Sequence, residues 1–244
     1  KYTLHLLTFN FAGLVLLFLL QITQAYLPLN PAHLPNVTWH TAWNTAVSFV
    51  TNTNWQSYSG ETTMSLLVQM TGLTVQNFVS AATGIAVLLA LIRGLTRKTS
   101  QLIGNYWVDM TRTILYVLLP LSLLLAILLA GQGVVQNFRG SETVTTLEGA
   151  TQVLPMGPAA SQIAIKQLGT NGGGFFNANS AHPFENPTPF SSFLEMLAIL
   201  LIPSALIYTY GKMAGSLRHG RALFAAMLIM LLSGLVISLI SEYS

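Results

Sequence analysis

The chain has 244 residues, of which 52% are hydrophobic and only 7% are charged, against roughly 25% charged residues in an ordinary soluble domain. Its mean hydropathy of +0.59 is typical of membrane proteins and excludes an ordinary soluble enzyme or binding domain. The formal net charge of +3 is small, and the absence of cysteine excludes disulfides, thiolate metal sites and cysteine nucleophiles.

Five apolar segments are long enough to cross a bilayer, because a helix needs about 20 mainly apolar residues to span the hydrocarbon core. They cover residues 4–26, 63–92, 107–131, 190–211 and 222–241. The second segment contains Gly72, Asn77 and Gly84, so we expect it to tilt, bend or face protein rather than lipid. The sequence therefore predicts an all-α, polytopic membrane protein.

The spans are joined by two short connections, residues 93–106 and 212–221, and by two long ones, residues 27–62 and 132–189. If the spans alternate in direction, eight of the ten basic residues fall on the side of the short connections. These eight are Lys1, Arg93, Arg97, Lys98, Arg112, Lys212, Arg218 and Arg221. The positive-inside rule then places the short connections in the cytoplasm and the long ones outside.

Each long connection contains a short apolar helix that is followed at once by a polar loop. In the first, an apolar stripe runs from Trp39 to Val50, and the polar residues 51–60 follow. In the second, Pro158 opens a helix that continues to Leu168, and the glycine-rich residues 169–177 follow. At about 10 residues each, these helices are too short to span a bilayer, and we expect re-entrant segments.

The order of span, re-entrant helix, polar loop and span occurs twice and indicates an internal repeat. We expect a first repeat in residues 1–98, a second in residues 99–217, and the first helix of an incomplete third in residues 218–244. The dipeptides Thr53-Asn54 and Thr170-Asn171 correspond in this alignment and lie 117 positions apart. Because a third repeat is incomplete, we expect the chain to be a fragment of a longer protein.

The two polar loops have the composition of a cation site. The consecutive glycines 172–174 cannot hold a helix, and they leave backbone carbonyls free to turn toward a ligand. The C-terminus of each re-entrant helix adds partial negative charge at the loop. Neutral oxygen ligands suit a weakly hydrated monovalent ion, and neither loop contains the carboxylates usual in Ca²⁺ or Mg²⁺ sites. The ligand types permit either potassium or sodium. The alternative to a cation site is that each loop is a simple glycine-rich turn between helices.

The second loop closely resembles the second pore loop of the Kdp-type potassium-transporting ATPase A chain. The resemblance lies in Thr170-Asn171-Gly172-Gly173-Gly174-Phe175-Phe176-Asn177 and continues to Pro187. Residues 51–61 are similar to the first pore loop of that family, and residues 72–78 follow as they do there. The resemblance extends over nearly the whole chain.

This resemblance implies a fold similar to that of potassium channels and of the superfamily of potassium transporters built from four fused repeats. Here it implies two M1–pore helix–M2 repeats plus one further transmembrane helix. It also implies a potassium-binding and translocating subunit of an ATP-driven, high-affinity uptake complex in the bacterial inner membrane. The selectivity-filter positions that match are Asn52, Thr53, Asn54, Gln56, Thr170, Asn171, Gly172, Gly173 and Gly174.

The resemblance implies a potassium ion at these positions, with no organic cofactor and no transition-metal site. It places ATP hydrolysis in a separate P-type catalytic subunit, with small accessory subunits and no nucleic acid in the complex. The glycines of the second loop are followed by Phe175 and Phe176 rather than by the Lys and Ser/Thr of a phosphate-binding loop, so we expect no enzymatic activity in this chain alone. The family chain is more than twice as long, so two further pore loops are missing and this chain alone should not close a filter.

Four polar side chains outside the filter carry separate expectations. We expect Asp109 to cap a helix end or to pair with Arg112 at the i+3 position. Glu185 is expected near the external mouth, where it either attracts cations or is a solvated or helix-start carboxylate. Glu195, one turn into the fourth span, is expected to snorkel or to pair, and His182 to support the loop.

Two other functions fit the same residues. A passive or gradient-coupled potassium channel or transporter would use the same loops without a P-type partner. A non-conducting structural membrane subunit would bind no ion. In that case, replacing Gly172 with aspartate would leave the measured ion preference unchanged.

Overall fold

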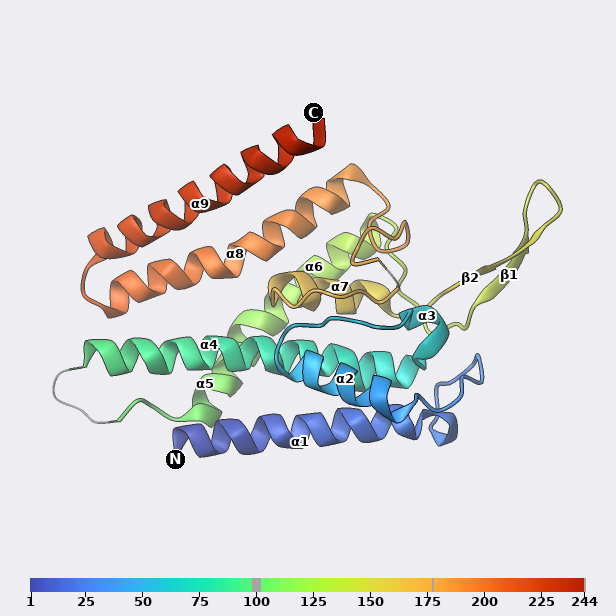
Figure 1. Ribbon diagram of the computed structural model, residues 1–244, viewed down its shortest axis with the longest axis horizontal. Helices are drawn as coiled ribbons and strands as arrows, with labels where there is room; N and C mark the ends of the chain where they lie inside the picture. The colour runs from blue at the N-terminus through green and yellow to red at the C-terminus, as the bar shows by residue number, and fades with distance from the viewer. Residues whose placement is uncertain (98–101, 177, 244) are drawn as a thin grey trace.

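The computed structural model describes residues 1–97, 102–176 and 178–243 (Figure 1). Five helical segments have the length and apolar composition to cross a membrane: α1 (Tyr2–Ile22), Val68–Thr96, Tyr106–Gly131, α8 (Pro189–Met213) and α9 (Leu217–Tyr243). They confirm the five predicted spans with shifted ends, and the chain is a multi-pass, mainly helical membrane protein. Lys98, Asn177 and the predicted repeat boundary at residues 98 and 99 lie outside the described residues.

The second span begins with a π-helical turn, η2 (Val68–Thr74), which continues directly into α4 (Val75–Thr96). In this wide turn the Thr74 hydroxyl donates to the backbone carbonyl of Gln69 at 2.8 Å. Gly72 lies against α1, and a Cβ at this position would be 2.9 Å from Cδ1 of Leu17. The expectation that this segment faces protein is therefore confirmed at Gly72, and the π turn itself was not predicted.

The third span also contains a π turn. It consists of α5 (Tyr106–Thr113), η3 (Ile114–Leu118) and α6 (Leu119–Gly131), with Pro120 in the first turn of α6. Proline has no N–H and its ring clashes with the carbonyl one turn earlier in a regular helix. The wider turn before Pro120 accommodates both effects, and the span continues without breaking.

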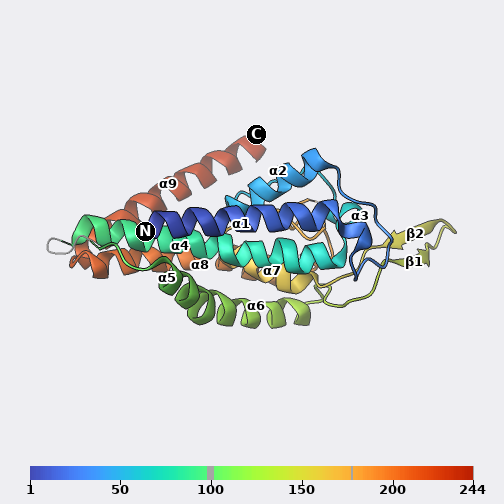
Figure 2. The same cartoon turned by 90° about the horizontal axis from the view of Figure 1, so that it is seen from below.

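Two short helices, α2 (Trp39–Val50) and α7 (Ala159–Leu168), lie among the long ones (Figure 2). They confirm the two short helices predicted from the apolar stripes. The α2 helix packs against α1 and buries Ala42, Ala46 and Phe49. The α7 helix contacts α6 and α8, and nine of its ten residues are buried. A polar loop follows each of these helices, and in both loops buried residues such as Asn54 and Asn171 alternate with exposed ones such as Thr53 and Gly172.

Small residues allow the helices around α7 to approach one another closely. The buried alanines are Ala81, Ala82, Ala86 and Ala90 of α4 and Ala159, Ala160 and Ala164 of α7. In a bilayer, helices gain little from hydrophobic burial against each other and associate instead through close van der Waals packing. The alanine surfaces therefore explain how a ten-residue helix fits between full-length spans.

A two-stranded hairpin projects from one end of the bundle and was not predicted (Figure 1). Strands β1 (Glu142–Thr145) and β2 (Thr151–Leu154) pair antiparallel. Thr146 N–H donates to the carbonyl of Ala150 at 2.8 Å, and Gly149 adopts a positive φ of 83° in the turn. The alternating threonine and valine residues favour a strand because β-branched side chains fit the pleat. Apart from this exposed ribbon, the chain is mainly helical, as predicted.

Asp109 pairs with Arg93 rather than with Arg112, which corrects the expected i+3 pair. Arg93 makes two hydrogen bonds to the Asp109 carboxylate, at 2.6 and 2.8 Å, and the Tyr2 hydroxyl donates to the same group at 3.0 Å. Pairing along one helix was expected from sequence spacing alone. The fold instead brings α1, α4 and α5 together at one buried carboxylate.

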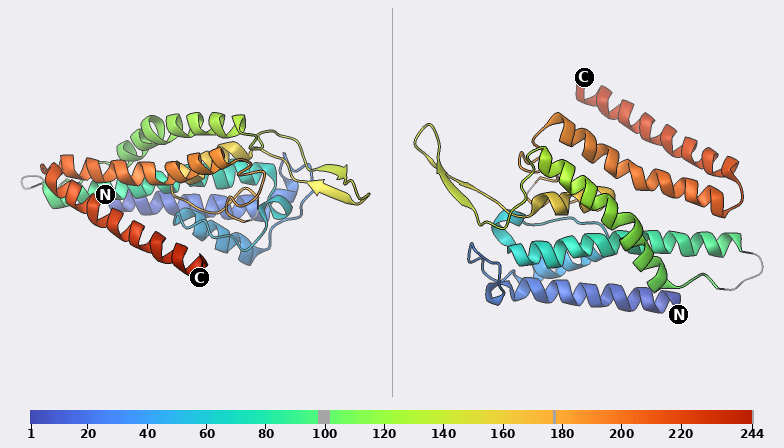
Figure 3. Two further views of the ribbon diagram at one scale, coloured as in Figure 1. Left: turned by 90° about the horizontal axis from the view of Figure 1, so that it is seen from above. Right: turned by 180° about the vertical axis from the view of Figure 1, so that it is seen from behind.

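The last span, α9, contacts α8 near the start of α9 and then diverges from it towards the C-terminus (Figure 3). The two helices meet closely at two glycines, where a Cβ on Gly220 would lie 3.0 Å from the Cα of Gly211. Gly220 is the one buried residue among the described residues of α9. The α9 helix is thus attached to the bundle through α8 and exposes most of its apolar surface.

Candidate functional site

The two polar loops, residues 51–60 (the first loop) and residues 169–176 (the second loop), contact each other. The side-chain amide of Asn52 donates to the Gly169 carbonyl at 3.3 Å. A Cβ on Gly172 would lie 3.5 Å from the carbonyl oxygen of Thr53. The structure therefore brings together the two stretches that the sequence predicted as pore loops.

The backbones of the two loops leave their helices in the same way. Asn52 and Thr170 have positive φ values of 63° and 53°. The next residue in each loop, Thr53 or Asn171, donates its N–H to a carbonyl five residues earlier, at 2.9 and 3.0 Å respectively. This pair of features is the Schellman ending of a helix, in which one left-handed residue reverses the chain.

The Schellman endings place Thr53 opposite Asn171 and Asn54 opposite Gly172, an offset of one position from the predicted alignment. Asn54 and Gly172 again share a positive φ, at 54° and 92°. The dipeptide match of Thr53-Asn54 with Thr170-Asn171 was therefore wrong as a structural alignment. It relied on side-chain identity, whereas the helix endings set the equivalence of the loops.

Both loops present backbone carbonyls without hydrogen-bond donors. Within the described part of the chain, no donor reaches the carbonyl oxygens of residues 52–54 or 170–173. Carbonyls without a protein donor are free to bind water, an ion or another partner, and a buried carbonyl without any partner costs free energy. The loops therefore offer a set of neutral oxygen ligands close to two helix C-termini, where the helix dipole favours positive charge.

The asparagine side chains of the loops are largely occupied with holding the loops against α4. Asn52 Oδ1 accepts hydrogen bonds from the Ser80 hydroxyl, at 2.8 Å, and from the Asn171 side-chain amide. Asn171 also donates to Ser80 at 3.1 Å, and Asn54 donates to Asn77 at 2.5 Å. The Asn52 amide oxygen therefore belongs to an amide network that joins both loops to α4, whereas Oδ1 of Asn54 and Oδ1 of Asn171 are buried without a hydrogen-bond partner in the described structure.

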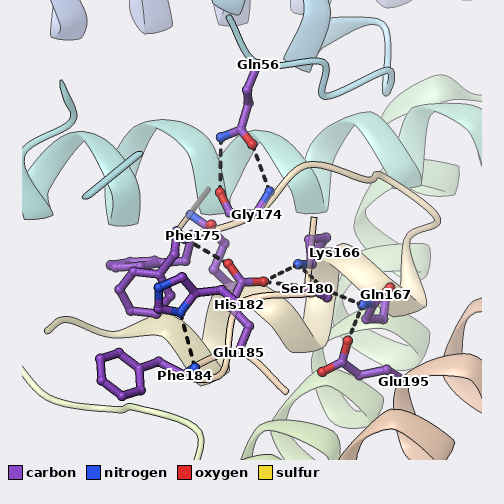
Figure 4. A network of polar contacts seen from close by, with 12 residues as sticks. Gln56, Lys166, Gln167, Gly174, Phe175, Ser180, His182, Phe184, Glu185 and Glu195 are labelled. Carbon is purple, nitrogen blue, oxygen red and sulfur yellow. Dashed lines mark hydrogen bonds and ion pairs between the residues drawn. The ribbon is translucent and has the colours of Figure 1, made fainter. Parts of the chain in front are cut away.

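Gln56 also has a structural role that the sequence did not indicate. Its Oε1 accepts the Gly174 N–H at 2.8 Å, and its Nε2 donates to the Gly174 carbonyl at 3.0 Å (Figure 4). Gln56 Nε2 also donates to the hydroxyl of Tyr58 at 3.2 Å, and burial raises the pKa of that phenol above its ordinary value, so it remains a neutral partner. Gln56 and Gly174 thus join the loops, and their polar groups are already paired.

Gly173 fits only as glycine at this junction. Its φ is 69°, and a Cβ would lie 2.8 Å from the Asn54 carbonyl oxygen and 3.0 Å from Gln56 Oε1. A side chain would therefore push the two loops apart. The requirement for glycine here comes from close backbone approach as well as from the dihedral angle.

An ion pair lies on the other side of the second loop. Lys166 Nζ is 2.6 Å from Glu185 Oε2, and the two side chains are 2% and 0% exposed. This corrects both expectations for Glu185, which is neither at an open mouth nor solvated. Lys166 was missed as a functional candidate, although a lysine on the apolar stripe of a short helix was the available signal.

Glu195 of α8 is buried, which excludes snorkelling, and it is paired by a hydrogen bond at Oε2 only, since Oε1 has no partner among the described residues. Gln167 Nε2 donates to Glu195 Oε2 at 2.5 Å and to the Ser180 hydroxyl at 3.0 Å. His182 supports the loop as expected, since its ring stacks on Phe176 at a centroid distance of 4.7 Å. These contacts connect the segment after the second loop to α7 and α8 (Figure 4).

Comparison with known proteins identifies the relatives of the chain. The model of the family described as the potassium-transporting ATPase A subunit matches residues 1–244. Subunits named "Potassium-transporting ATPase potassium-binding subunit" from Yersinia pseudotuberculosis and Pseudomonas aeruginosa are each 60% identical to the chain over 242 residues. The same-named subunit of Pseudomonas syringae pv. tomato is 59% identical over 243 residues.

These alignments cover 99–100% of this chain but only 43% of each relative. The chain therefore spans less than half the length of the relatives it matches.

Proposed function

The chain belongs to the potassium-transporting ATPase A subunit family, and we propose that it is part of a subunit that selects and passes potassium ions for an ATP-driven uptake complex. The proposed ligands are backbone carbonyls of the first and second loops. The relatives are named as potassium-binding subunits of a potassium-transporting ATPase. The proposal transfers that role to the two loops of this chain.

The observation that carries the proposal is the set of unpaired carbonyls at residues 52–54 and 170–173 in the described structure. Rings of such carbonyls replace the hydration shell of a weakly hydrated cation in selectivity filters. The adjacent ends of α2 and α7 add partial negative charge without a fixed carboxylate. A neutral site of this kind binds an ion and also releases it, as transport requires.

Two loops supply only part of a ring. The relatives extend well beyond the aligned region, and we propose that their remaining length supplies two further loops. We further propose that residues 1–98 and 99–217 are the first two repeats and that residues 218–244 begin a third. In this arrangement α9, exposed along most of its length, packs against the part of the subunit that this chain lacks.

The proposed complex also contains a P-type subunit that hydrolyses ATP, together with small accessory subunits. The chain itself contributes ion binding and no ATPase site. In the bacterial inner membrane, the basic connections would face the cytoplasm, and the loops and the β1–β2 hairpin would face outward. This orientation follows from the positive-inside rule.

Uptake of rubidium at micromolar external ion tests the proposal, with the full-length subunit expressed in cells deficient in potassium transport. The measurement compares the wild type with and without its P-type partner, and with Gly172→Asp. Gly149→Asp is the matched control, because Gly149 also has a positive φ but has no atom within 4 Å of a Cβ, at the hairpin turn. We expect a loss of potassium over sodium selectivity in Gly172→Asp only.

Unchanged ion preference in correctly inserted Gly172→Asp would overturn the filter and favour a structural subunit. Uptake that proceeds without the P-type partner would instead identify a passive or gradient-coupled transporter. Inserted protein is quantified in the same membranes, so that a folding defect is not read as a loss of selectivity.

A further inference from the structure

The rear of the second loop is held by a buried carboxylate. Glu185 Oε1 accepts the backbone N–H of Phe176 at 2.8 Å, and Oε2 accepts from the Ser180 hydroxyl at 3.3 Å and from Lys166 Nζ. The same carboxylate touches Gly174, where a Cβ would lie 2.8 Å from Glu185 Oε1. Glu185 therefore contacts the loop directly after the glycines with unpaired carbonyls.

Gln56 holds the same residue from the opposite loop. It bonds both backbone groups of Gly174, while Glu185 bonds Phe176 two residues later (Figure 4). The peptide groups between these anchors have little freedom to rotate. The Gly173 carbonyl belongs to the same peptide group as the Gly174 N–H, so its direction depends on these anchors, Gln56 and Glu185 (the clamp).

Lys166 makes a charged anchor compatible with a cation filter. A lone buried carboxylate would be costly to desolvate and would place a full negative charge behind the loop. Lys166 comes from α7, the helix that ends at the second loop, and its Nζ also donates to the Ser180 hydroxyl at 2.5 Å. The pair therefore combines a strong charge-assisted hydrogen bond to the loop with local neutralisation of charge.

The first loop is held differently in the described structure. Its side chains bond there to neutral groups, which belong to Ser80, Asn77, the Asn171 side chain and the backbone of the second loop. The buried charge pair of Lys166 and Glu185 acts on the second loop. Glu195 is linked to this cluster through Gln167 and Ser180, so the clamp is also tied to α8.

We propose that Lys166 and Glu185 are positioning residues of the second loop, which together set cation affinity and selectivity through the geometry and charge balance of the clamp. This inference rests on the proposed function of the loops. It assigns no contact between either side chain and the ion. The proposal predicts that mutations of the two residues are energetically coupled, because each side chain affects cation affinity mainly through its contact with the other.

The test is a double-mutant cycle in the full-length subunit within its complete complex, using Glu185→Gln, Lys166→Met and the double variant. The amide introduced by Glu185→Gln retains an acceptor for the Phe176 N–H, and the double variant contains neither buried charge. We expect each single change to raise KM for rubidium uptake by at least about tenfold, because it disrupts the buried charge pair. The double variant is expected to recover part of that loss.

Arg139→Met with Glu142→Gln is the matched control, because this pair has the same charge types at 3.1 Å but is 76% and 44% exposed. We expect no change in KM or in rubidium over sodium selectivity from this control. The amount of assembled complex is measured for every variant by detergent extraction and size-exclusion chromatography.

Strictly additive effects, or single variants with normal KM and selectivity at normal assembly, would overturn the positioning role. Variants that lower assembly while leaving KM and selectivity unchanged would also overturn it, because they would show a purely structural ion pair. Gly172→Asp is run in parallel. If it alters selectivity while the cycle shows no coupling, this inference fails and the filter proposal stands; if it alters nothing, the filter proposal itself fails.

Discussion

The side-chain amide of Gln56 forms hydrogen bonds with both the N–H and the carbonyl of Gly174, which lies 118 residues later in the chain. Gln56 and Gly174 are equivalent positions when the two loops are aligned on the ends of α2 and α7, and they bond directly to each other. The contact joins the two loops at the end of their series of unpaired carbonyls. The relative position of the carbonyl groups thus depends on one neutral side chain from the first loop.

Gln56→Ala is expected to weaken potassium binding by separating the loops. It leaves the Gly174 N–H and carbonyl without their partners, and each lost bond of a buried group costs about 1–3 kcal/mol. We expect KM for uptake by the full-length complex to rise about tenfold or more. Gln152→Ala, on the exposed strand β2, is the control, and an equal effect in both variants would contradict the bridging role.

Ser80→Ala is expected to disturb both loops at once. The Ser80 hydroxyl donates to Asn52 and accepts from Asn171, at 2.8 and 3.1 Å. We expect a loss of about 1–2 kcal/mol in stability together with lower potassium over sodium selectivity. Thermal unfolding and competition uptake measure the two effects.

Ser122→Ala is the matched control for Ser80. Ser122 is also a buried serine on a long helix, but its hydroxyl has no hydrogen-bond partner among the described residues. Its removal is expected to be neutral or slightly stabilising, because a buried unpaired hydroxyl is lost. Similar losses in the two variants would show that serine packing, rather than the amide network, explains the result.

Asp109→Asn is expected to destabilise the bundle at the end opposite the hairpin. It weakens two charge-assisted bonds from Arg93 and one bond from Tyr2, so we expect a loss of about 1–3 kcal/mol. Arg112→Gln should change stability by no more than about 0.5 kcal/mol, as at most exposed positions. Thermal unfolding of the purified complex measures both variants. A local Asp109–Arg112 pair, as expected from sequence spacing, predicts equal losses of stability in the two variants.

The long-range partners of Asp109 explain which features were predictable from the sequence. The spans and the short helices α2 and α7 follow from length, hydropathy and the polar residues that come after them, all of which are local. The partner of Asp109 lies on another helix, and the partner of Glu185 lies across a loop. Such contacts depend on how helices pack, and sequence spacing does not contain that information.

The loops themselves show the same distinction. Their glycines and neutral polar residues indicated a cation site, and the structure brings the two loops together. Their alignment was misplaced by one position because Thr-Asn occurs in both loops, while equivalence is set by where the backbone turns left-handed. Asn52 and Gln56 were predicted as filter residues, but their side chains are engaged in hydrogen bonds between the loops.

Thr170 offers a test of whether backbone or side-chain oxygens bind the ion. It is an exposed β-branched residue with a φ of 53°, a conformation that Asn52 adopts at the equivalent position with a φ of 63°. Left-handed backbone costs an ordinary residue about 1–2 kcal/mol, and asparagine tolerates it better. Thr170→Asn is therefore expected to stabilise the complex while keeping the backbone carbonyl in place.

If backbone carbonyls are the ligands, Thr170→Asn and Thr170→Val should both keep KM within about twofold of the wild type. The two variants separate strain from ligand chemistry, because valine lacks the hydroxyl but keeps the β-branched strain. Only asparagine is expected to raise the thermal unfolding midpoint. A large rise in KM in both variants would instead make the Thr170 hydroxyl a ligand, since its loss is the one change that they share.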